Sequence, residues 1–428
     1  MNRCLLSLVV VTLLISCEKP ADKKPTVLTG ATPEAAGFSS ERLARLDSGM
    51  SDWVKKNWVN GSVALIARKG KIVFHKAYGY NDLDAKTPLD KNGIFRIASQ
   101  TKAITTAAAL MLWEEGKFSF DDPVAKFIPS FANQTVLATF NPKDTTYTSV
   151  PVKRPVTIRD ILTHTSGIGY PAIGSPEANA IYSKNKITGG VGVKDQKLSD
   201  AMTRLGNVPL LFQPGEKWMY GVNTDLLGYL IEIWSDKTLE EFFADRIFKP
   251  LGMNDTYFNV PQEKASKLVN FFQEQEGVIK KQETVFDGFV DLNFPLQKHD
   301  YFSGGGGLSS TITDYATFLQ MLLNGGEYNG KRYLARNTVR LMTMNQIGDL
   351  FQSGENKFSF GFSLVTENGS RFTPSQPGTY AWGGVFSTSY WVDPKEEMVV
   401  VFYRQMWGPH IGDTDRAFKP LVYQAIND

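Results

Sequence analysis

The sequence predicts an α+β fold, an α/β sandwich in which helices flank an antiparallel β-sheet and a mainly helical subdomain is inserted into the chain. Segments with strand character lie near both ends, at 62–80 and 387–403, and segments with helical spacing fill the middle. A helix that is apolar nearly all round follows Ser99 and should be buried at the centre. The two chain ends are therefore expected to form one sheet, with the helical subdomain at about 103–355 between its portions.

The first 17 residues have the pattern of an export signal. A basic start precedes an apolar run that is too short for a comfortable membrane span. The run ends in Leu14-Ile15-Ser16-Cys17, which resembles the bacterial lipobox, where the signal is cut before a cysteine that receives a lipid. We expect a lipoprotein-type signal peptide at 1–17, a tether at 18–34 and the folded domain at 35–428. The protein would then be exported to the bacterial periplasm or outer membrane and held at the membrane through Cys17. A secreted protein with a simple cleaved signal is the alternative.

Composition excludes several classes of partner and site. The 428 residues include 46 basic and 44 acidic ones, a net charge of +2, so no strong field attracts nucleic acid. Both cysteines, Cys4 and Cys17, lie in the export segment. The mature domain therefore has no disulfide, no cysteine nucleophile and no cysteine metal site. We expect no cofactor and no metal.

The other elements follow from periodicity and turn residues. A helix is expected to begin near Phe38, and Arg68-Lys69-Gly70 joins the two strands of a hairpin. His75 lies on that hairpin and is expected to be a surface or half-buried strand residue. Two segments, 133–155 and 171–200, are predicted loops at the rim of the site. Further helices are expected at 99–116, 225–235, 239–248, 313–324 and 413–426, and further strands at 387–392 and 398–403.

Ser99 and Lys102 form the first candidate for chemistry. Ser-x-x-Lys occurs three times, at Ser16, Ser99 and Ser183, but only Ser99 opens an apolar helix. Residues three apart share a helix face, so the Lys102 amine should lie beside the Ser99 hydroxyl. Burial disfavours the ammonium form, and a neutral amine can take the serine proton. A plain N-cap serine with a solvated lysine is the alternative.

Two later segments add candidates. Tyr220 follows the turn Pro214-Gly215 and precedes an apolar helix, and near a lysine its phenol can serve as a general base or relay. A half-buried core tyrosine is the alternative. The pair Gly383-Gly384 leads into the penultimate strand, where glycines let the backbone approach a ligand. A β-bulge is the alternative there.

Taken together, these residues resemble the serine β-lactamase and penicillin-binding-protein superfamily, on the branch of class C β-lactamases, D-amino-acid peptidases and family VIII carboxylesterases. The resemblance runs from about Ala35 to Phe402. It is carried by 95–102, 120–124, 161–167, 213–215 with Tyr220, 250–253, 304–308 and 383–384.

The resemblance implies a role for each matching position. Ser99 would be the acylated nucleophile, Lys102 its proton acceptor, and Tyr220 the group that activates Ser99 or the deacylating water. The N–H groups of Ser99 and Val385 would form the oxyanion hole. His164, in the His-Thr-Ser-Gly segment, would be a buried structural residue.

Two departures from the family pattern bear on the substrate. The β-lactamases carry Tyr-x-Asn, whereas here the asparagine is Asn223, one position later. Their Lys-Thr-Gly is here Trp382-Gly383-Gly384, which has no cation for a substrate carboxylate. Trp382, Gly383, Gly384 and Asn223 are the predicted pocket residues, and the pattern favours hydrolysis of carboxylic esters.

Other functions stay open at this point. A β-lactamase and a D-amino-acid-specific peptidase of the DD-carboxypeptidase kind are alternatives within the class, with a small ester, amide or β-lactam as substrate. A non-catalytic penicillin or cell-wall sensor is the alternative of another class. An α/β-hydrolase has little support because the chain has no Gly-x-Ser-x-Gly elbow, and it has no His-Glu-x-x-His zinc motif.

Overall fold

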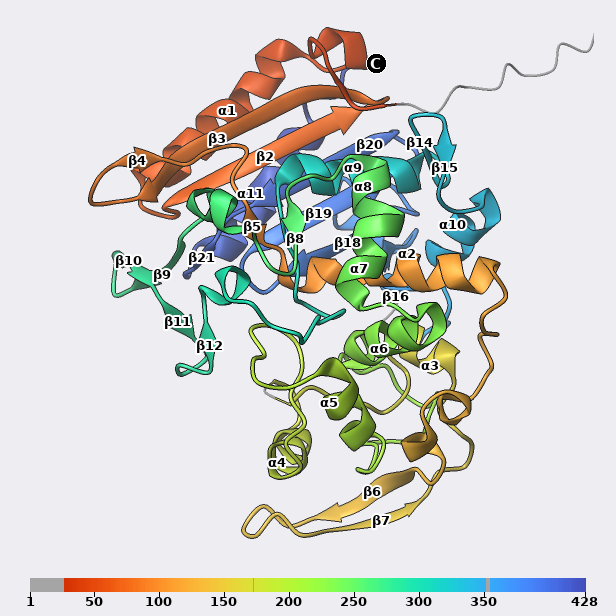
Figure 1. Ribbon diagram of the computed structural model, residues 1–428. Coiled ribbons are helices and arrows are strands. Elements are labelled where there is room, and N and C mark those ends of the chain that lie inside the picture. The colour runs from red at the N-terminus through yellow and green to blue at the C-terminus, as the bar shows by residue number, and fades with distance from the viewer. Residues whose placement is uncertain (1–26, 172, 352–354) are drawn as a thin grey trace, which may run out of the picture.

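A nine-stranded sheet spans the upper part of the molecule in Figure 1. The computed structural model describes residues 27–171, 173–351 and 355–428. The strand order is β1-β3-β2-β20-β19-β18-β17-β16, with β4 paired to β3, and every pair is antiparallel except β1 with β3. The bounds are β1 Thr29–Gly30, β2 Gly61–Arg68, β3 Lys71–Asp82, β4 Thr87–Pro88, β16 Asn356–Phe358, β17 Ser363–Val365, β18 Tyr380–Gly384, β19 Thr388–Asp393 and β20 Met398–Tyr403. The predicted mixed fold around an antiparallel sheet is confirmed.

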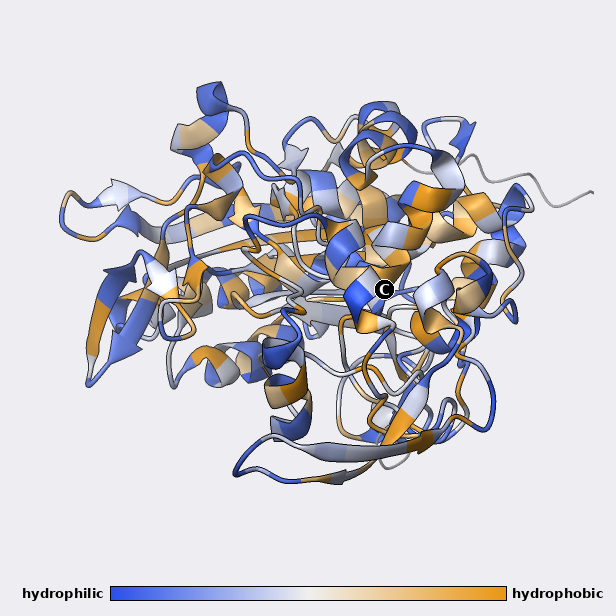
Figure 2. Ribbon diagram, turned by 60° about the horizontal axis from the view of Figure 1, so that its bottom comes forward, coloured by the Kyte–Doolittle hydropathy of each residue, from blue (hydrophilic) through white to orange (hydrophobic). Residues whose placement is uncertain are grey.

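Helices cover both faces of this sheet. Successive residues of β2 point to opposite faces, so Leu65 joins one hydrophobic core and Ile66 the other. The first core also holds α2 (Thr101–Glu114) and α9 (Ile312–Leu323), and the second holds α1 (Ser40–Lys55) and α11 (Ile411–Tyr423). Figure 2, coloured by hydropathy, shows orange and blue segments alternating along the helices.

The segment between α2 and β16 passes through the lower part of Figure 1 and then returns to the sheet through α9. Helices are the longest regular elements of this segment, but fewer than half of its residues are helical, and short strand pairs and irregular connections lie between them. Its helices are α3 Ile158–Leu162, α4 Pro176–Lys184, α5 Leu198–Leu205, α6 Asn223–Ser235, α7 Leu239–Phe243, α8 Lys249–Leu251, α9 and α10 Arg336–Met342, with a π-helical turn, Ala244–Phe248, between α7 and α8.

The small sheets are built from hairpins and from segments distant in sequence. β5 (Phe95–Arg96) and β8 (Thr256–Tyr257) both pair with β13 (Ser309–Ser310). β9 (Phe271–Gln275) pairs with β10 (Val278–Gln282) and, in parallel, with β21 (Met406–Trp407). Two further pairs are β11 Thr284–Val285 with β12 Val290–Asp291, and β14 Glu327–Tyr328 with β15 Lys331–Arg332.

The prediction of loops at 133–155 and 171–200 is wrong, because both segments contain regular secondary structure. Segment 133–155 contains the hairpin of β6 (Thr135–Phe140) and β7 (Tyr147–Pro151). All five residues of β7 are exposed, so the apolar alternation that usually marks a strand is absent. Segment 171–200 contains α4, which Ser175 caps with Pro176 at its first turn, and the start of α5.

Part of the predicted tether is also folded. Thr29–Gly30, within 18–34, pairs with Lys71 and Ile72 of β3. Cys17 and the signal peptide lie outside the described residues. Within the described part of the chain, no helix combines the length and apolarity that a membrane span requires.

Candidate active site

Ser99 stands at the entrance of α2, in the 3₁₀ turn Ala98–Gln100. Its neighbours Ala98 and Gln100 are buried, whereas Ser99 is half-buried. Two tyrosine hydroxyls donate hydrogen bonds to Gln100 of this turn. Tyr403 donates to the side-chain Oε1 (2.8 Å), and Tyr315 donates to the backbone carbonyl oxygen (2.9 Å). Ala98 has φ +43°, in the left-handed region that non-glycine residues rarely adopt. These contacts fix the turn that carries the half-buried Ser99.

Lys102 is one turn further along α2 and is 2% exposed. Its Nζ lies 3.4 Å from Ser99 Oγ, 3.0 Å from the Tyr170 hydroxyl and 2.6 Å from the Gly305 carbonyl oxygen. The expected proximity of the serine and the lysine is thus present. Its partners are hydroxyls and a backbone carbonyl rather than a carboxylate, a setting in which the amine can pass a proton to and from Ser99.

Tyr170 is a site residue that the sequence prediction missed. It is 8% exposed and touches the same lysine. Burial, with a smaller contribution from Tyr220, raises the pKa of its phenol well above the usual value. The phenol therefore stays protonated and holds Lys102 in place. Tyr170 directly precedes the predicted loop at 171–200, and no sequence motif indicates that it contacts the site.

Tyr220 lies above the lysine amine, whose Nζ is 4.6 Å from its ring centroid. The Trp382 indole N–H reaches the Tyr220 hydroxyl at 3.4 Å, and the two rings are 5.5 Å apart. Four predicted site residues, Ser99, Lys102, Tyr220 and Trp382, are therefore brought together by α2, the segment before α6, and β18.

Asn223 is not in the pocket. It is fully buried at the start of α6, where its amide oxygen accepts from Ser166 Oγ (2.5 Å) and its amide nitrogen lies 3.1 Å from His164 Nδ1. The one-residue shift from Tyr-x-Asn thus moves the amide behind Tyr220. His164 is buried with φ +57°, and burial, assisted by the charge of Lys102, lowers its pKa to about 3. As expected, it is a neutral structural residue.

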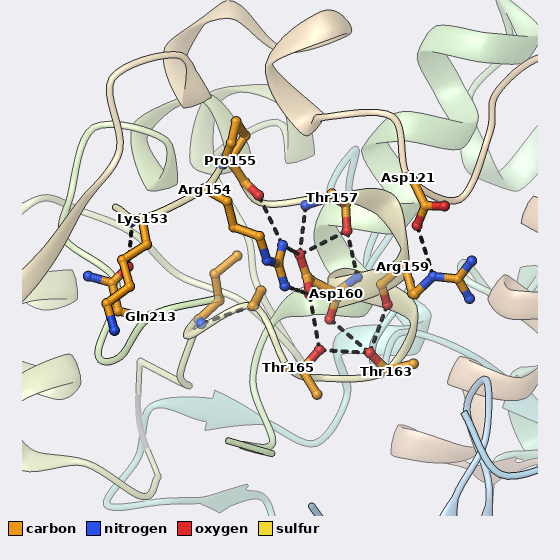
Figure 3. Close-up of polar contacts among 12 residues, drawn as sticks. Asp121, Lys153, Arg154, Pro155, Thr157, Arg159, Asp160, Thr163, Thr165 and Gln213 are labelled. Atoms are coloured by element: carbon orange, nitrogen blue, oxygen red, sulfur yellow. Dashed lines mark hydrogen bonds and ion pairs between the residues drawn. The ribbon is translucent and has the colours of Figure 1, made fainter. Parts of the chain in front are cut away.

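An ion pair fixes the segment that carries His164 (Figure 3). Arg154 donates two hydrogen bonds to the carboxylate of Asp160, at 2.6 and 2.8 Å. Asp160 also completes a capping box with Thr157 at the start of α3 and accepts from Thr165 Oγ1. His164, which lies between Asp160 and Thr165 in sequence, packs 5.1 Å from the Tyr220 ring.

The predicted oxyanion-hole residues come from two chain segments. Gly384 ends β18 so close to Ile97 that a Cβ on it would lie within 2.4 Å of the Ile97 carbonyl oxygen. Only glycine allows this approach. It brings the Gly384–Val385 peptide beside the turn of Ser99. Val385 itself is 41% exposed and begins the connection to β19.

Asp225 is a buried acid behind the lysine, and the sequence prediction did not include it. Its carboxylate accepts from Ser303 Oγ (2.5 Å) and from the N–H groups of Gly305 (3.0 Å) and Gly190 (2.8 Å). Burial raises its pKa, although these donors and the charge of Lys102 oppose the rise. The carbonyl oxygen of Gly305 accepts from Lys102 Nζ, so Asp225 holds in place the residue that contacts the amine.

A family model described as Beta-lactamase matches residues 46–422. The chain belongs to the beta-lactamase family. Its relatives in this family include Esterase EstB of Burkholderia gladioli, 28% identical over 407 residues that cover 89% of this chain and 97% of the esterase. A candidate D-alanyl-D-alanine carboxypeptidase of Escherichia coli K12 is 29% identical over 441 residues, covering 96% of this chain and 93% of that protein.

Among solved structures of beta-lactamase relatives, EstCE1, a hydrolase with promiscuous acyltransferase activity, superposes with a TM-score of 0.78. It is 26% identical, and the match covers 90% of this chain and 99% of that one. The chain is therefore a beta-lactamase-related protein of the serine hydrolase kind, as the sequence motifs predicted. No group of three or more His, Cys, Asp or Glu residues is placed to hold a metal ion in the part of the chain that the structure describes.

Proposed function

We propose that this protein hydrolyses carboxylic esters through an acyl-enzyme on Ser99. The arrangement of Ser99, Lys102 and Tyr220 supports an acyl-enzyme mechanism. The contact between the Trp382 indole and the Tyr220 hydroxyl carries the choice of substrate, because it places an aromatic wall where the β-lactamases of the family have a lysine.

The first half of the reaction acylates the serine. Lys102 accepts the hydroxyl proton while Ser99 Oγ attacks the ester carbonyl carbon. The N–H groups of Ser99 and Val385 stabilise the negative oxygen that forms. When the C–O bond breaks, the proton passes through Lys102 and Tyr220 to the leaving alkoxide, and an alcohol departs.

The second half returns the free enzyme. A water gives a proton to the same pair of groups and attacks the acyl carbon. Collapse of the second tetrahedral intermediate breaks the bond to Ser99 Oγ, which takes back a proton, and the carboxylic acid leaves. Tyr170 stays protonated throughout and positions the lysine.

Esters are favoured over penicillin-like substrates because the pocket offers little to a carboxylate. Trp382 occupies the position of the cation, and the Asn223 amide is bonded to Ser166 and His164. An uncharged substrate can instead pack against Trp382 and Tyr220. Esterase EstB among the relatives supports this choice.

Intact-protein mass spectrometry of a soluble form that lacks residues 1–17 tests the proposal. We expect a transient adduct and turnover with p-nitrophenyl acetate, and neither with Ser99→Ala. A stable penicillin adduct without ester turnover would instead favour the sensor or the peptidase. Labelling that survives in Ser99→Ala would refute the mechanism.

We also propose that Cys17 is lipidated and that the protein is exported and anchored to a bacterial membrane. The lipobox-like Leu14-Ile15-Ser16-Cys17 supports this. Metabolic labelling with an alkyne fatty acid should mark the wild type and not Cys17→Ala. Equal labelling of both would refute lipid attachment at this residue.

A further inference from the structure

We propose that Gln405, a buried amide outside the reacting groups, sets the distance between the two halves of the oxyanion hole. This inference rests on the proposed function, because it assigns a positioning role in the acyl-transfer step. Gln405 is 1% exposed and lies in the segment between β20 and β21, distant in sequence from Ser99 and adjacent to the turn after Val385.

The turn after β18 is held almost entirely by residues 404–407. The Trp407 indole N–H donates to the carbonyl of Val385 at 2.6 Å. The Gln405 amide donates to the carbonyl of Phe386 at 3.4 Å, and Arg404 donates to that of Ser387 through its backbone N–H at 3.2 Å. Each carbonyl of the turn 385–387 therefore has a donor from one short segment.

The same Gln405 amide is also hydrogen-bonded to Arg96 of β5, the strand that precedes Ser99. Its nitrogen donates to the Arg96 carbonyl at 3.2 Å and also faces the Arg404 carbonyl at 3.1 Å, so its two hydrogens are shared among three carbonyl oxygens. Its oxygen accepts from the Arg96 backbone N–H at 3.2 Å and from the Arg96 guanidinium at 3.3 Å. These donors and acceptors fix the orientation of the amide. One side chain thus links the peptide three residues before Ser99 to the residue after Val385.

This link matters because the two oxyanion donors belong to segments that are far apart in sequence. Stabilisation of an oxyanion requires both N–H groups within about 2.7–3.1 Å of one point, so small errors in their separation lower the rate. The close approach of Gly384 to Ile97 limits the separation on one side of the turn, and Gln405 limits it on the other.

Gln405→Glu is the test variant, since it keeps the shape and the acceptors for Arg96 but removes the amide donors. We expect kcat/KM for p-nitrophenyl acetate to fall about 10- to 100-fold, less than the roughly 10²- to 10³-fold loss when an oxyanion donor itself is removed, because both N–H groups stay and only their spacing changes. KM should change less than about threefold. Affinity for 2,2,2-trifluoroacetophenone, which forms a tetrahedral oxyanion with an active serine, should fall by the same factor as kcat/KM.

Gln320→Glu is the matched control, because Gln320 is also 1% exposed but lies on α9 and contacts Asn324. It should lower the melting temperature without changing the ratio of ketone affinity to KM. Should Gln405→Glu fail to fold, Trp407→Phe removes one donor to the same turn and should show the same signature at about three- to tenfold.

The outcomes separate the two proposals. Wild-type protein without Ser99-dependent turnover would refute the ester hydrolase, and the role of Gln405 with it. Normal turnover by folded Gln405→Glu, or by Trp407→Phe where Gln405→Glu does not fold, would refute only the positioning role. A loss of activity with unchanged ketone affinity would also refute it.

Discussion

Replacing Lys102 by methionine should abolish activity while leaving the protein about as stable as before. The amine is buried and bonded to Ser99, Tyr170 and the Gly305 carbonyl. Methionine fills a similar volume without a charge or a donor. The variant therefore separates the contribution of the amine to chemistry from its contribution to folding.

Two opposing effects of similar size determine the stability of Lys102→Met: the loss of hydrogen bonds and the removal of a buried polar group. A hydrogen bond contributes about 0.5–1.5 kcal/mol, and the Gly305 carbonyl would lose such a partner. Against this, methionine avoids the cost of burying a polar group, about 1–3 kcal/mol. We expect the free energy of unfolding to change by less than about 2 kcal/mol, whereas loss of the general base should lower kcat/KM about 10²- to 10⁴-fold.

Urea unfolding and ester hydrolysis measure the two effects on one preparation. Lys126→Met is the control, because Lys126 is solvent-exposed and pairs with Asp122 one turn away. It should change stability by less than about 1 kcal/mol and leave kcat/KM unaltered. A loss of more than about 3 kcal/mol in Lys102→Met would show that the amine is chiefly structural, and activity above a tenth of the wild type would refute its catalytic role.

Four further predictions address the surroundings of the amine. Tyr220→Phe should lower kcat about 10²- to 10⁴-fold with little change in stability, measured by steady-state kinetics and thermal unfolding. Trp382→Lys should raise the ratio of cephalosporin to ester turnover by about tenfold, because it adds a partner for a carboxylate; an unchanged ratio in a chromogenic assay would contradict this. Burial holds the pKa of His164 at about 3 against 6.5 in the unfolded chain, so the unfolded state binds the proton first as pH falls, and stability is full above pH 6.5 and declines towards pH 3. Urea unfolding should show a loss of about 2 kcal/mol from this group between pH 7 and pH 5, absent in His164→Asn, which tolerates a positive φ. Asp160→Ala should cost about 2–3 kcal/mol, since Arg154 and the first turn of α3 lose their acceptor; unfolding at the wild-type urea midpoint would show that this network is dispensable.

The contact between Ser99 and Lys102 could be predicted because its signal is local. Ser99 opens an apolar helix, and the i, i+3 spacing of Lys102 fixes the contact within one turn. The prediction of Tyr220 as a site residue depended on the order of several motifs along the chain, because its neighbouring residues alone do not distinguish it from a core tyrosine. The central strands could also be predicted from the sequence, since Gly61–Arg68 and Met398–Tyr403 are apolar runs between turn residues.

What escaped prediction depends on contacts across the fold. Tyr170 contacts Lys102, and Asp225 contacts Gly305, only because the fold brings together segments that are far apart in sequence. No spacing or motif within either segment indicates these contacts. The exposed hairpin at 135–151 buries too little apolar surface to leave a pattern. By contrast, the Ser175-Pro176 start of α4 was readable as a helix cap and should have been recognised.

The pairing of β2 with β20 imposes an order of events on synthesis of the chain. Leu65 pairs with Val401, roughly 340 positions later, so the middle of the sheet must wait for the last strands. At about 5–20 residues per second, this wait lasts tens of seconds. During that time the β2–β3 hairpin has one unpaired, strongly apolar edge, which is a template for association with other chains. The nascent protein should therefore depend on protection of this edge by chaperones until Tyr403 has emerged.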